Sequence, residues 1–135
     1  MIDIFAGDPP IRRCAIQSFP FGVVYTHRAT VGEDGRPQTS VVWVDTDGEN
    51  VVFNTTNKRA KGRNLRANPV VSISVWDNAD PYSYFEVQGP AELTEEGAAE
   101  HINDLSHRYQ GEDFHTPVDR VIVRVQPARV LDHMD

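Results

Sequence analysis

Five of the nine residues from Lys58 to Arg66 are basic, in a chain that is acidic overall. The five cations are Lys58, Arg59, Lys61, Arg63 and Arg66, and no Asp or Glu occurs between residues 50 and 76. The whole chain has 135 residues and a formal net charge of −7. A local positive region on a negative protein attracts one small anion, whereas nucleic acid requires a broad basic surface. The segment is therefore predicted to bind a small anionic group, and the chain is not expected to bind nucleic acid.

The place of this basic segment in the chain indicates which anion it could bind. Residues 52–65, VFNTTNKRAKGRNL, run from an expected strand into an expected helix. The first amides of a helix have no intrahelical acceptor, and the helix dipole favours negative charge there. With the hydroxyls of Thr55 and Thr56 and the amide of Asn57, they provide the donors that phosphate oxygens need. The alternative is a solvated basic helix face, but no Glu balances the cations at the i±4 positions.

Patterns for other kinds of chemistry are missing from the sequence. No two of the five histidines share a helix or strand face at metal-ligand spacing, and there is no nucleophile elbow, P-loop or dinucleotide-binding glycine pattern. The single cysteine, Cys14, has no obvious activating base and cannot form an internal disulfide. No apolar run could span a membrane, and no secretion signal is recognisable. We therefore expect a cytoplasmic protein that binds neither a metal nor a membrane.

Short β-branched runs separated by turn pairs dominate the rest of the chain. Asp34-Gly35 and Asp47-Gly48 predict hairpin turns, and Gly89-Pro90 predicts a bulge or a sheet edge. The expected strands begin with a run that opens at Val23–Tyr25 and continue with Gln38–Asp45, Val51–Thr55, Val70–Trp76, Tyr84–Leu93 and Val118–Val130, the last interrupted or ended near Pro127.

Two helices complete the predicted set of elements. The first covers Lys58–Ala67 and ends at Asn68-Pro69, although Gly62 weakens it by about 1 kcal/mol relative to alanine. The second begins at a Thr94 N-cap and ends near Tyr109, with an apolar stripe. About six strands without βαβ alternation predict a single mainly β domain, a small closed or half-open antiparallel barrel with helices packed outside.

Several patterns in this order resemble one protein family. They are D-G-R-P before a strand, F-N-T, R-A-K-G-R-N-L-R-A-N-P, PYSYFEVQGPAEL, HRY and VIVRVQPARV, and they cover about residues 29–131. The chain resembles the split β-barrel flavin and deazaflavin oxidoreductases of the pyridoxamine-phosphate-oxidase-like fold, in the branch that uses coenzyme F420. The resemblance implies a six-stranded antiparallel split β-barrel of the FMN-binding type. It also implies a homodimer with two cofactors at the subunit interface, and hydride transfer between the reduced cofactor and a small organic acceptor.

The resemblance also implies which residues hold the cofactor. Lys61 would be the main cation at the phosphate, and Ala60 stands where flavin-using relatives commonly have Arg, which favours a deazaflavin with Lys58 or Arg59 in support. The strand from Thr39 to Trp43 would flank the ring, and the region from Trp76 to Tyr84 would be presented by the other subunit. The implied cofactor-binding residues are Thr39, Ser40, Val41, Val42, Trp43, Asn54, Thr55, Lys58, Arg59, Ala60, Lys61, Trp76, Tyr82 and Tyr84.

Two other functions remain open at this stage, and one part of the chain departs from the family pattern. An FMN-dependent oxidase or reductase would be yellow when purified, and a cofactor-binding protein without turnover would bind but not react. Residues 1–28 do not match the helix and apolar first strand with which family members usually begin. His27 and Arg28 stand where apolar residues are expected.

Overall fold

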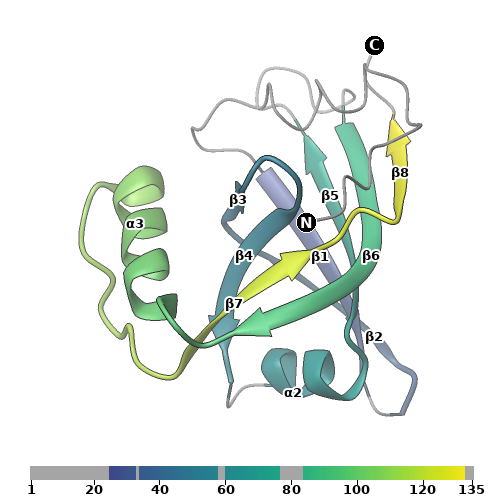
Figure 1. Cartoon of the computed structure of the whole chain (residues 1–135), viewed down its shortest axis with the longest axis horizontal. Helices are drawn as coiled ribbons and strands as arrows, with labels where there is room; N and C mark the ends of the chain where they lie inside the picture. Colours follow the sequence, from purple (N-terminus) through teal and green to yellow (C-terminus); the bar gives the residue numbers. More distant parts are fainter. Residues whose placement is uncertain (1–24, 33, 58–59, 77–83, 133–135) are drawn as a thin grey trace.

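A computed structural model of the chain describes residues 25–32, 34–57, 60–76 and 84–132, shown in colour in Figure 1. Cys14, and with it almost all of the atypical segment 1–28, lies outside this part. In the described part, the strands are β1 (Tyr25–Val31), β2 (Pro37–Val41), β3 (Val44–Thr46), β4 (Val51–Thr56), β5 (Val70–Trp76), β6 (Tyr84–Thr94), β7 (Arg120–Val125) and β8 (Arg129–Asp132). The helices are α2 (Ala60–Ala67) and α3 (Ala98–Gln110).

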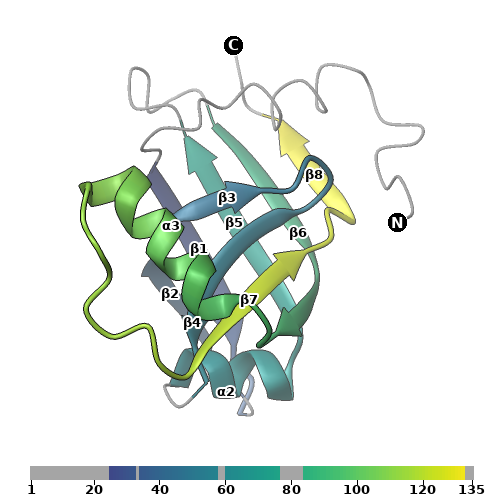
Figure 2. The same cartoon turned by 60° about the vertical axis from the view of Figure 1, so that its left-hand side comes forward.

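The strands form one curled antiparallel sheet in the order β2-β1-β5-β6-β7-β4-β3, with β8 paired to β6. The two end strands, β2 and β3, follow each other in sequence but are not hydrogen-bonded, so the barrel is split between them. In Figures 1 and 2, α2 lies across one end of the barrel and α3 packs outside β3, β4 and β7. The predicted mainly β split barrel with external helices is thus confirmed.

The split explains why the described sheet has eight strands rather than six. The expected strand Gln38–Asp45 ends at Val41 and resumes at Val44, because β2 pairs with β1 whereas β3 pairs with β4. The expected final strand breaks into β7 and β8, which lie beside successive parts of β6. At the first break the chain moves from one partner strand to another, whereas at the second it stays beside β6 and leaves β4. Periodicity within a strand carries no information about such changes of pairing.

Gly89 explains where the second break falls. A Cβ atom at this position would lie 1.7 Å from the carbonyl oxygen of Gln126, so only glycine lets the β7–β8 connection pass so closely. The amides of Gln126 and Ala128 donate to Pro90 O and Gln88 O on either side of it. The irregularity predicted at Gly89-Pro90 therefore lies on the strand opposite, while β6 itself runs without interruption.

The two helices keep their predicted character but not all of their predicted ends. The α2 helix ends at Ala67 as expected, and residues 58–59 lie outside the described part. The predicted Thr94 N-cap is wrong, because Thr94 is the last residue of β6 and a left-handed Gly97 precedes α3 without any side-chain cap. The apolar stripe of α3 is confirmed, because Ala98, Ile102 and Leu105 are all buried.

The main core fills the inside of the barrel. Alternate residues of β4, Val51 and Phe53, belong to it, whereas Val52 faces outward and packs on Ala98 of α3. Val42 and Val44 pack against the core at the split. The barrel therefore has a packed interior, and its other surfaces remain for ligands and partners.

Candidate functional site: the junction of β4 and α2 and the strand beside it

The predicted anion-binding segment begins where β4 ends. Thr55 is buried, and the Thr56 hydroxyl is also shielded from solvent yet has no hydrogen-bond partner among the described residues. The backbone amide of Asn57 donates to Asp119 O at 3.0 Å, which joins the end of the strand to the loop before β7. Because buried hydroxyls normally find a partner, the Thr56 oxygen marks a polar position that the described residues do not satisfy.

The first turn of α2 lies directly against the end of β4. A Cβ atom at Gly62 would be 2.2 Å from Thr56 O and 2.8 Å from Asn57 O. This contact explains a glycine that intrinsic helix propensity disfavours. On the other side of the barrel end, Asn64 donates to the Gln38 side chain at 3.1 Å, and Leu65 is fully buried. The helix is therefore held in a fixed position relative to β4 and β2.

The cations of this segment differ in what they contact. Arg66 donates to Asn57 and lies 3.3 Å from the Glu95 carboxylate, so its charge is already engaged. Arg63 is exposed and pairs with no acidic residue in the described part. The first turn of α2 contains no acidic residue. Lys61 is placed by its backbone only, in that first turn, and Lys58 and Arg59 lie outside the described residues.

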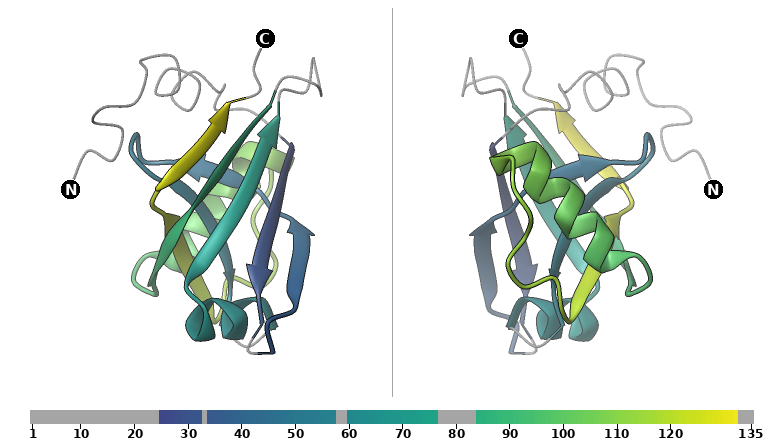
Figure 3. Two further views of the ribbon diagram at one scale, coloured as in Figure 1. Left: turned by 90° about the vertical axis from the view of Figure 1, so that its right-hand side faces the viewer. Right: turned by 90° about the vertical axis from the view of Figure 1, so that its left-hand side faces the viewer.

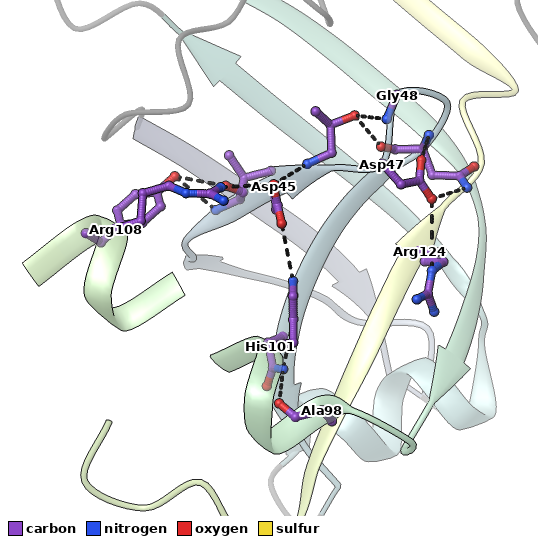
Figure 4. Close-up of polar contacts among 12 residues, drawn as sticks. Asp45, Asp47, Gly48, Ala98, His101, Arg108 and Arg124 are labelled. Carbon is purple, nitrogen blue, oxygen red and sulfur yellow. Dashed lines mark hydrogen bonds and ion pairs between the residues drawn. The ribbon is translucent and has the colours of Figure 1, made fainter. Parts of the chain in front are cut away.

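Asn54, a predicted cofactor ligand, has its side chain directed outward against α3. Its Nδ2 donates to Ala98 O at 2.9 Å and lies 3.1 Å from His101 Nδ1, while its Oδ1 accepts from Arg120 Nε at 2.8 Å. The Arg120 contact fixes the amide orientation, so His101 Nδ1 must accept and the imidazole proton must be on Nε2. That nitrogen faces Asp45 at 3.6 Å (Figure 4), which is too long for a well-formed hydrogen bond.

Asp45 joins β3 to α3 in the same network. Arg108 Nη1 donates to its Oδ1 at 2.9 Å, and Figure 4 shows Arg108 and His101 approaching this carboxylate from the helix. Burial raises the pKa of Asp45, but contacts with His101 and Arg108 and the Thr46 amide outweigh it and lower the pKa to about 2. This part of the structure fastens α3 to the barrel, and sequence reasoning missed it because its members are distant in sequence.

The strand predicted to flank the ring presents different side chains to its two faces. Thr39 is exposed, whereas Ser40 accepts a hydrogen bond from Arg28 at 3.0 Å and Val42 packs on the core. Trp43 stacks on Tyr109 with ring centroids 5.5 Å apart and meets the edge of Phe114 at 6.2 Å. Trp43 is thus held by α3 and the following loop. Val41 is placed by its backbone alone.

Arg28 is the most unusual residue near this strand. It is 1% exposed, its guanidinium lies 4.6 Å from the centroid of the Phe53 ring, and its buried Nε and Nη1 have no hydrogen-bond partner in the part of the chain that the structure describes. Burial lowers the pKa of Arg28 to about 10, so it remains charged at neutral pH. The available sequence signal was a cation in an otherwise apolar strand position.

Within one chain, the structure does not bring all predicted site residues together. Trp76 and Tyr84 pair at one end of the barrel, and α2 lies across the other (Figure 1). Trp76 is placed by its backbone, Tyr84 is half-buried, and Tyr82 lies outside the described residues. Ala60 likewise is placed only by its backbone, at the start of α2. β2 runs from the α2 end, where Gln38 contacts Asn64, towards the end at which Trp76 lies.

Two further features concern the described residues alone. They contain no group of three or more His, Cys, Asp or Glu side chains that could hold a metal ion. They also contain no helix of the length and apolar character needed to cross a membrane.

Comparison with known proteins agrees with the fold. The family model described as pyridoxamine 5'-phosphate oxidase matches residues 13–134. A solved structure named F420 reductase is 39% identical and has a TM-score of 0.76, with 85% of this chain and 94% of that chain covered. A conserved hypothetical protein from Mycobacterium tuberculosis is 27% identical with a TM-score of 0.71, with 89% and 84% covered.

A more distant match supports the fold alone. It is a Listeria innocua protein described as a possible pyridoxamine 5'-phosphate oxidase, 24% identical with a TM-score of 0.63, with 80% of this chain and 86% of that chain covered. Among curated proteins, none matches significantly. The family model spans nearly the whole chain and agrees with the split barrel, and the chain therefore belongs to the pyridoxamine 5'-phosphate oxidase family of oxidoreductases.

Proposed function

We propose that the protein is an oxidoreductase that uses the deazaflavin coenzyme F420 to reduce a small organic acceptor. The observation that carries this proposal is the 39% identity to an F420 reductase over 94% of that protein's length. A bound deazaflavin supplies two-electron hydride transfer at one ring carbon, while the protein binds, orients and excludes water. Because the cofactor carries the reaction, such an enzyme needs no catalytic triad, and none is recognisable in the sequence.

The junction of β4 and α2 fits the phosphate of such a cofactor. It combines the start of α2, where the first amides of a helix have no intrahelical acceptor, with the Thr56 hydroxyl, which has no partner among the described residues, and a first turn without acidic residues. Lys61, in that first turn, is the cation proposed to contact phosphate, with Lys58 or Arg59 in support. Asn54 would contribute mainly by holding β4 and α3 in place, because its side-chain amide already has protein partners.

The ring is proposed to lie along β2 and the connection to β3. Thr39 is accessible there, and Trp43 is immobilised between Tyr109 and Phe114. Trp76 and Tyr84 pair at the end of the barrel opposite α2, which is also the end where β2 leads into the connection to β3. As the family resemblance implies, Trp76, Tyr82 and Tyr84 of one chain are proposed to complete the site of another.

One face of the sheet is suited to pair two chains. The outer face of β1, β5 and β6 carries the small side chains Ala29, Ser72 and Ser74, and no described helix covers it (Figure 3, left). Ser72 and Gln88 both donate to the Glu86 carboxylate there. We propose that this face forms the homodimer interface. Sedimentation should show a dimer, and Ser74→Arg should shift it towards monomer, because a long cation would replace a small side chain.

Titration of the purified protein with oxidised F420, FMN and FAD tests the cofactor assignment. F420 should bind most tightly, and Lys61→Ala should weaken it at least tenfold, since a charge-assisted contact contributes about 1.5–3 kcal/mol. Arg66→Gln is the matched control, because the Arg66 charge is engaged by Glu95 and its loss should matter less. Unchanged F420 affinity in Lys61→Ala would overturn the site assignment.

An FMN-dependent oxidase or reductase is the second candidate, favoured by the family's own name. It predicts a yellow protein as purified and tighter binding of FMN than of F420. Saturable binding of either cofactor in its reduced form, without re-oxidation seen by absorbance on addition of any electron acceptor, would instead identify a non-catalytic binding protein.

A further inference from the structure

Asp119, in the loop before β7, has a backbone conformation that side chains rarely adopt. Its φ of 58° lies in the left-handed region, and it is the only non-glycine residue with a positive φ among the described residues. This region is sparsely populated because Cβ crowds the following carbonyl oxygen, although Asp and Asn tolerate it best. Such a conformation persists only where the surrounding structure requires it.

The side chain of Asp119 does not account for this conformation. It is exposed, and its carboxylate makes no hydrogen bond or ion pair in the part of the chain that the structure describes. The fold uses the backbone carbonyl instead, because this oxygen accepts from the Asn57 amide at 3.0 Å. Arg120 and Thr56 are the last paired residues of β7 and β4 at this end, so the bond links the two chain segments just beyond the ladder.

The first turn of α2 packs directly on Asn57. A Cβ atom at Gly62 would lie 2.8 Å from the carbonyl oxygen of Asn57 and 2.9 Å from its Cα. The Asn57 side chain is held as well, because it donates to Glu95 at 3.1 Å and accepts from Arg66. The place of Asn57 therefore determines where α2 begins, and the Asp119 carbonyl fixes the Asn57 backbone.

We propose that Asp119 is a positioning residue for phosphate binding, because its left-handed backbone directs a carbonyl to Asn57 and so holds the first turn of α2, with Lys61, at the end of β4. This inference rests on the proposed function. It requires the backbone conformation at position 119 and not the carboxylate. Residues that accept a positive φ can therefore replace Asp119 without loss, whereas β-branched residues cannot.

Three substitutions separate the backbone conformation of Asp119 from its charge. Asp119→Gly and Asp119→Asn leave the left-handed conformation accessible, Asp119→Val disfavours it, and all three remove the same negative charge. The ligands are oxidised F420 and the same deazaflavin with its ribityl chain but without the phosphate. Asp119→Val should bind F420 roughly tenfold more weakly than Asp119→Asn and Asp119→Gly do. All three variants should bind the phosphate-free compound equally.

Amide hydrogen exchange tests the link between Asp119 and Asn57 without any cofactor. The Asn57 N–H should be protected in wild type, Asp119→Gly and Asp119→Asn, and should exchange roughly tenfold faster in Asp119→Val. The amides of β5 are the control, because a similar loss of their protection would indicate global destabilisation instead. If Asp119→Val does not fold, Asp119→Ala, which disfavours a positive φ less strongly, replaces it in both measurements.

The outcomes distinguish this inference from the proposed function. Equal F420 affinities of Asp119→Val and Asp119→Asn, or an Asn57 amide that stays protected in Asp119→Val, would overturn the inference alone. Equal weakening of both compounds in Asp119→Val would show a general structural role and would also overturn it. If FMN rather than F420 binds, the F420 assignment fails, and FMN and riboflavin serve as the two compounds in the same comparison. Failure to bind any of them overturns both.

Discussion

Arg120 and Asn54 form a hydrogen bond across β7 and β4, with Nε donating to Oδ1 at 2.8 Å. This contact orients the Asn54 amide so that Nδ2 meets both Ala98 O and His101 Nδ1 on α3. One buried amide therefore links two strands and a helix. The same network continues through His101 towards Asp45 on β3 (Figure 4). It positions α3, and α3 in turn holds Trp43 beside the split.

Asn54→Leu should reduce the free energy of unfolding by about 2–4 kcal/mol. The substitution removes the buried hydrogen bonds that the Asn54 side chain makes with Arg120 Nε and Ala98 O and replaces the amide by an apolar group, so these bonds are lost from the folded state. Urea denaturation measures the change. Gln126→Ala, which removes an exposed amide, should stay within about 0.5 kcal/mol of wild type. Similar values for the two variants would contradict the role given to Asn54.

Proton-coupled nitrogen NMR should find the His101 proton on Nε2 at neutral pH. Asn54 presents an N–H to Nδ1, so the opposite tautomer would place two donors face to face at 3.1 Å. In the Asn54→Leu variant this constraint disappears, and the tautomer ratio should change. A wild-type proton on Nδ1 would refute the hydrogen-bond assignment.

Asp45→Asn should cost about 2 kcal/mol of stability at neutral pH and progressively less in acid. The pKa of Asp45 is lowered to about 2 in the folded protein from an ordinary value of 3.8, so the folded state favours the ionised form. Its stabilising effect is present above pH 4 and is lost as the pH falls from about 4 to about 2. Denaturant unfolding of wild type and Asp45→Asn at several pH values in this range measures whether the stability difference shrinks on acidification. A difference that grew on acidification would contradict it.

Gly62→Ala should destabilise the protein by about 1–3 kcal/mol although alanine is the better helix former. The added methyl group would overlap Thr56 O and push α2 away from β4. If α2 contributes to the phosphate site, cofactor affinity should fall as well. Gly32→Ala is a suitable control, because its new methyl group would be tight only against the exposed Asp34 side chain, which can move, and in ordinary contact with Asn64 Oδ1 and Arg36 O. An unaltered stability of Gly62→Ala would show that the close contact is not needed.

Tyr109→Phe should lower the free energy of unfolding by about 1–2 kcal/mol and increase the mobility of the Trp43 ring. The Tyr109 hydroxyl donates to Val44 O at 3.0 Å and accepts from Val44 N at 3.2 Å. Phenylalanine has no hydroxyl and can make neither hydrogen bond. Thermal unfolding gives the cost, and Trp43 fluorescence in a Trp76→Phe background gives the mobility of the ring. An unchanged fluorescence anisotropy would argue that Phe114 alone immobilises Trp43.

The local pattern of the sequence determined most of the elements and their faces. β-branched alternation gave β5 from Val70 to Trp76, and the turn pairs Asp34-Gly35 and Asp47-Gly48 gave the two hairpins. The stripe from Ala98 to Leu105 gave the buried face of α3. These features depend on neighbours within a few residues, which is why they can be read from one chain. The basic segment between β4 and β5 was evident for the same reason.

Only the tertiary structure decided where the chain changes strand partners and what the polar side chains contact. The break after Val41 follows from curling the sheet until β2 and β3 face each other unpaired, and the break after Val125 lies where the chain passes Gly89 of β6. From its neighbours in sequence, Arg28 is a cation where an apolar residue is expected, and Asn54 is predicted to belong to an anion-binding turn. Their partners, Phe53 and Arg120, lie 25 and 66 residues away and become neighbours only when the barrel forms. Long-range contacts of this kind depend on packing, which the periodicity of a single strand does not encode.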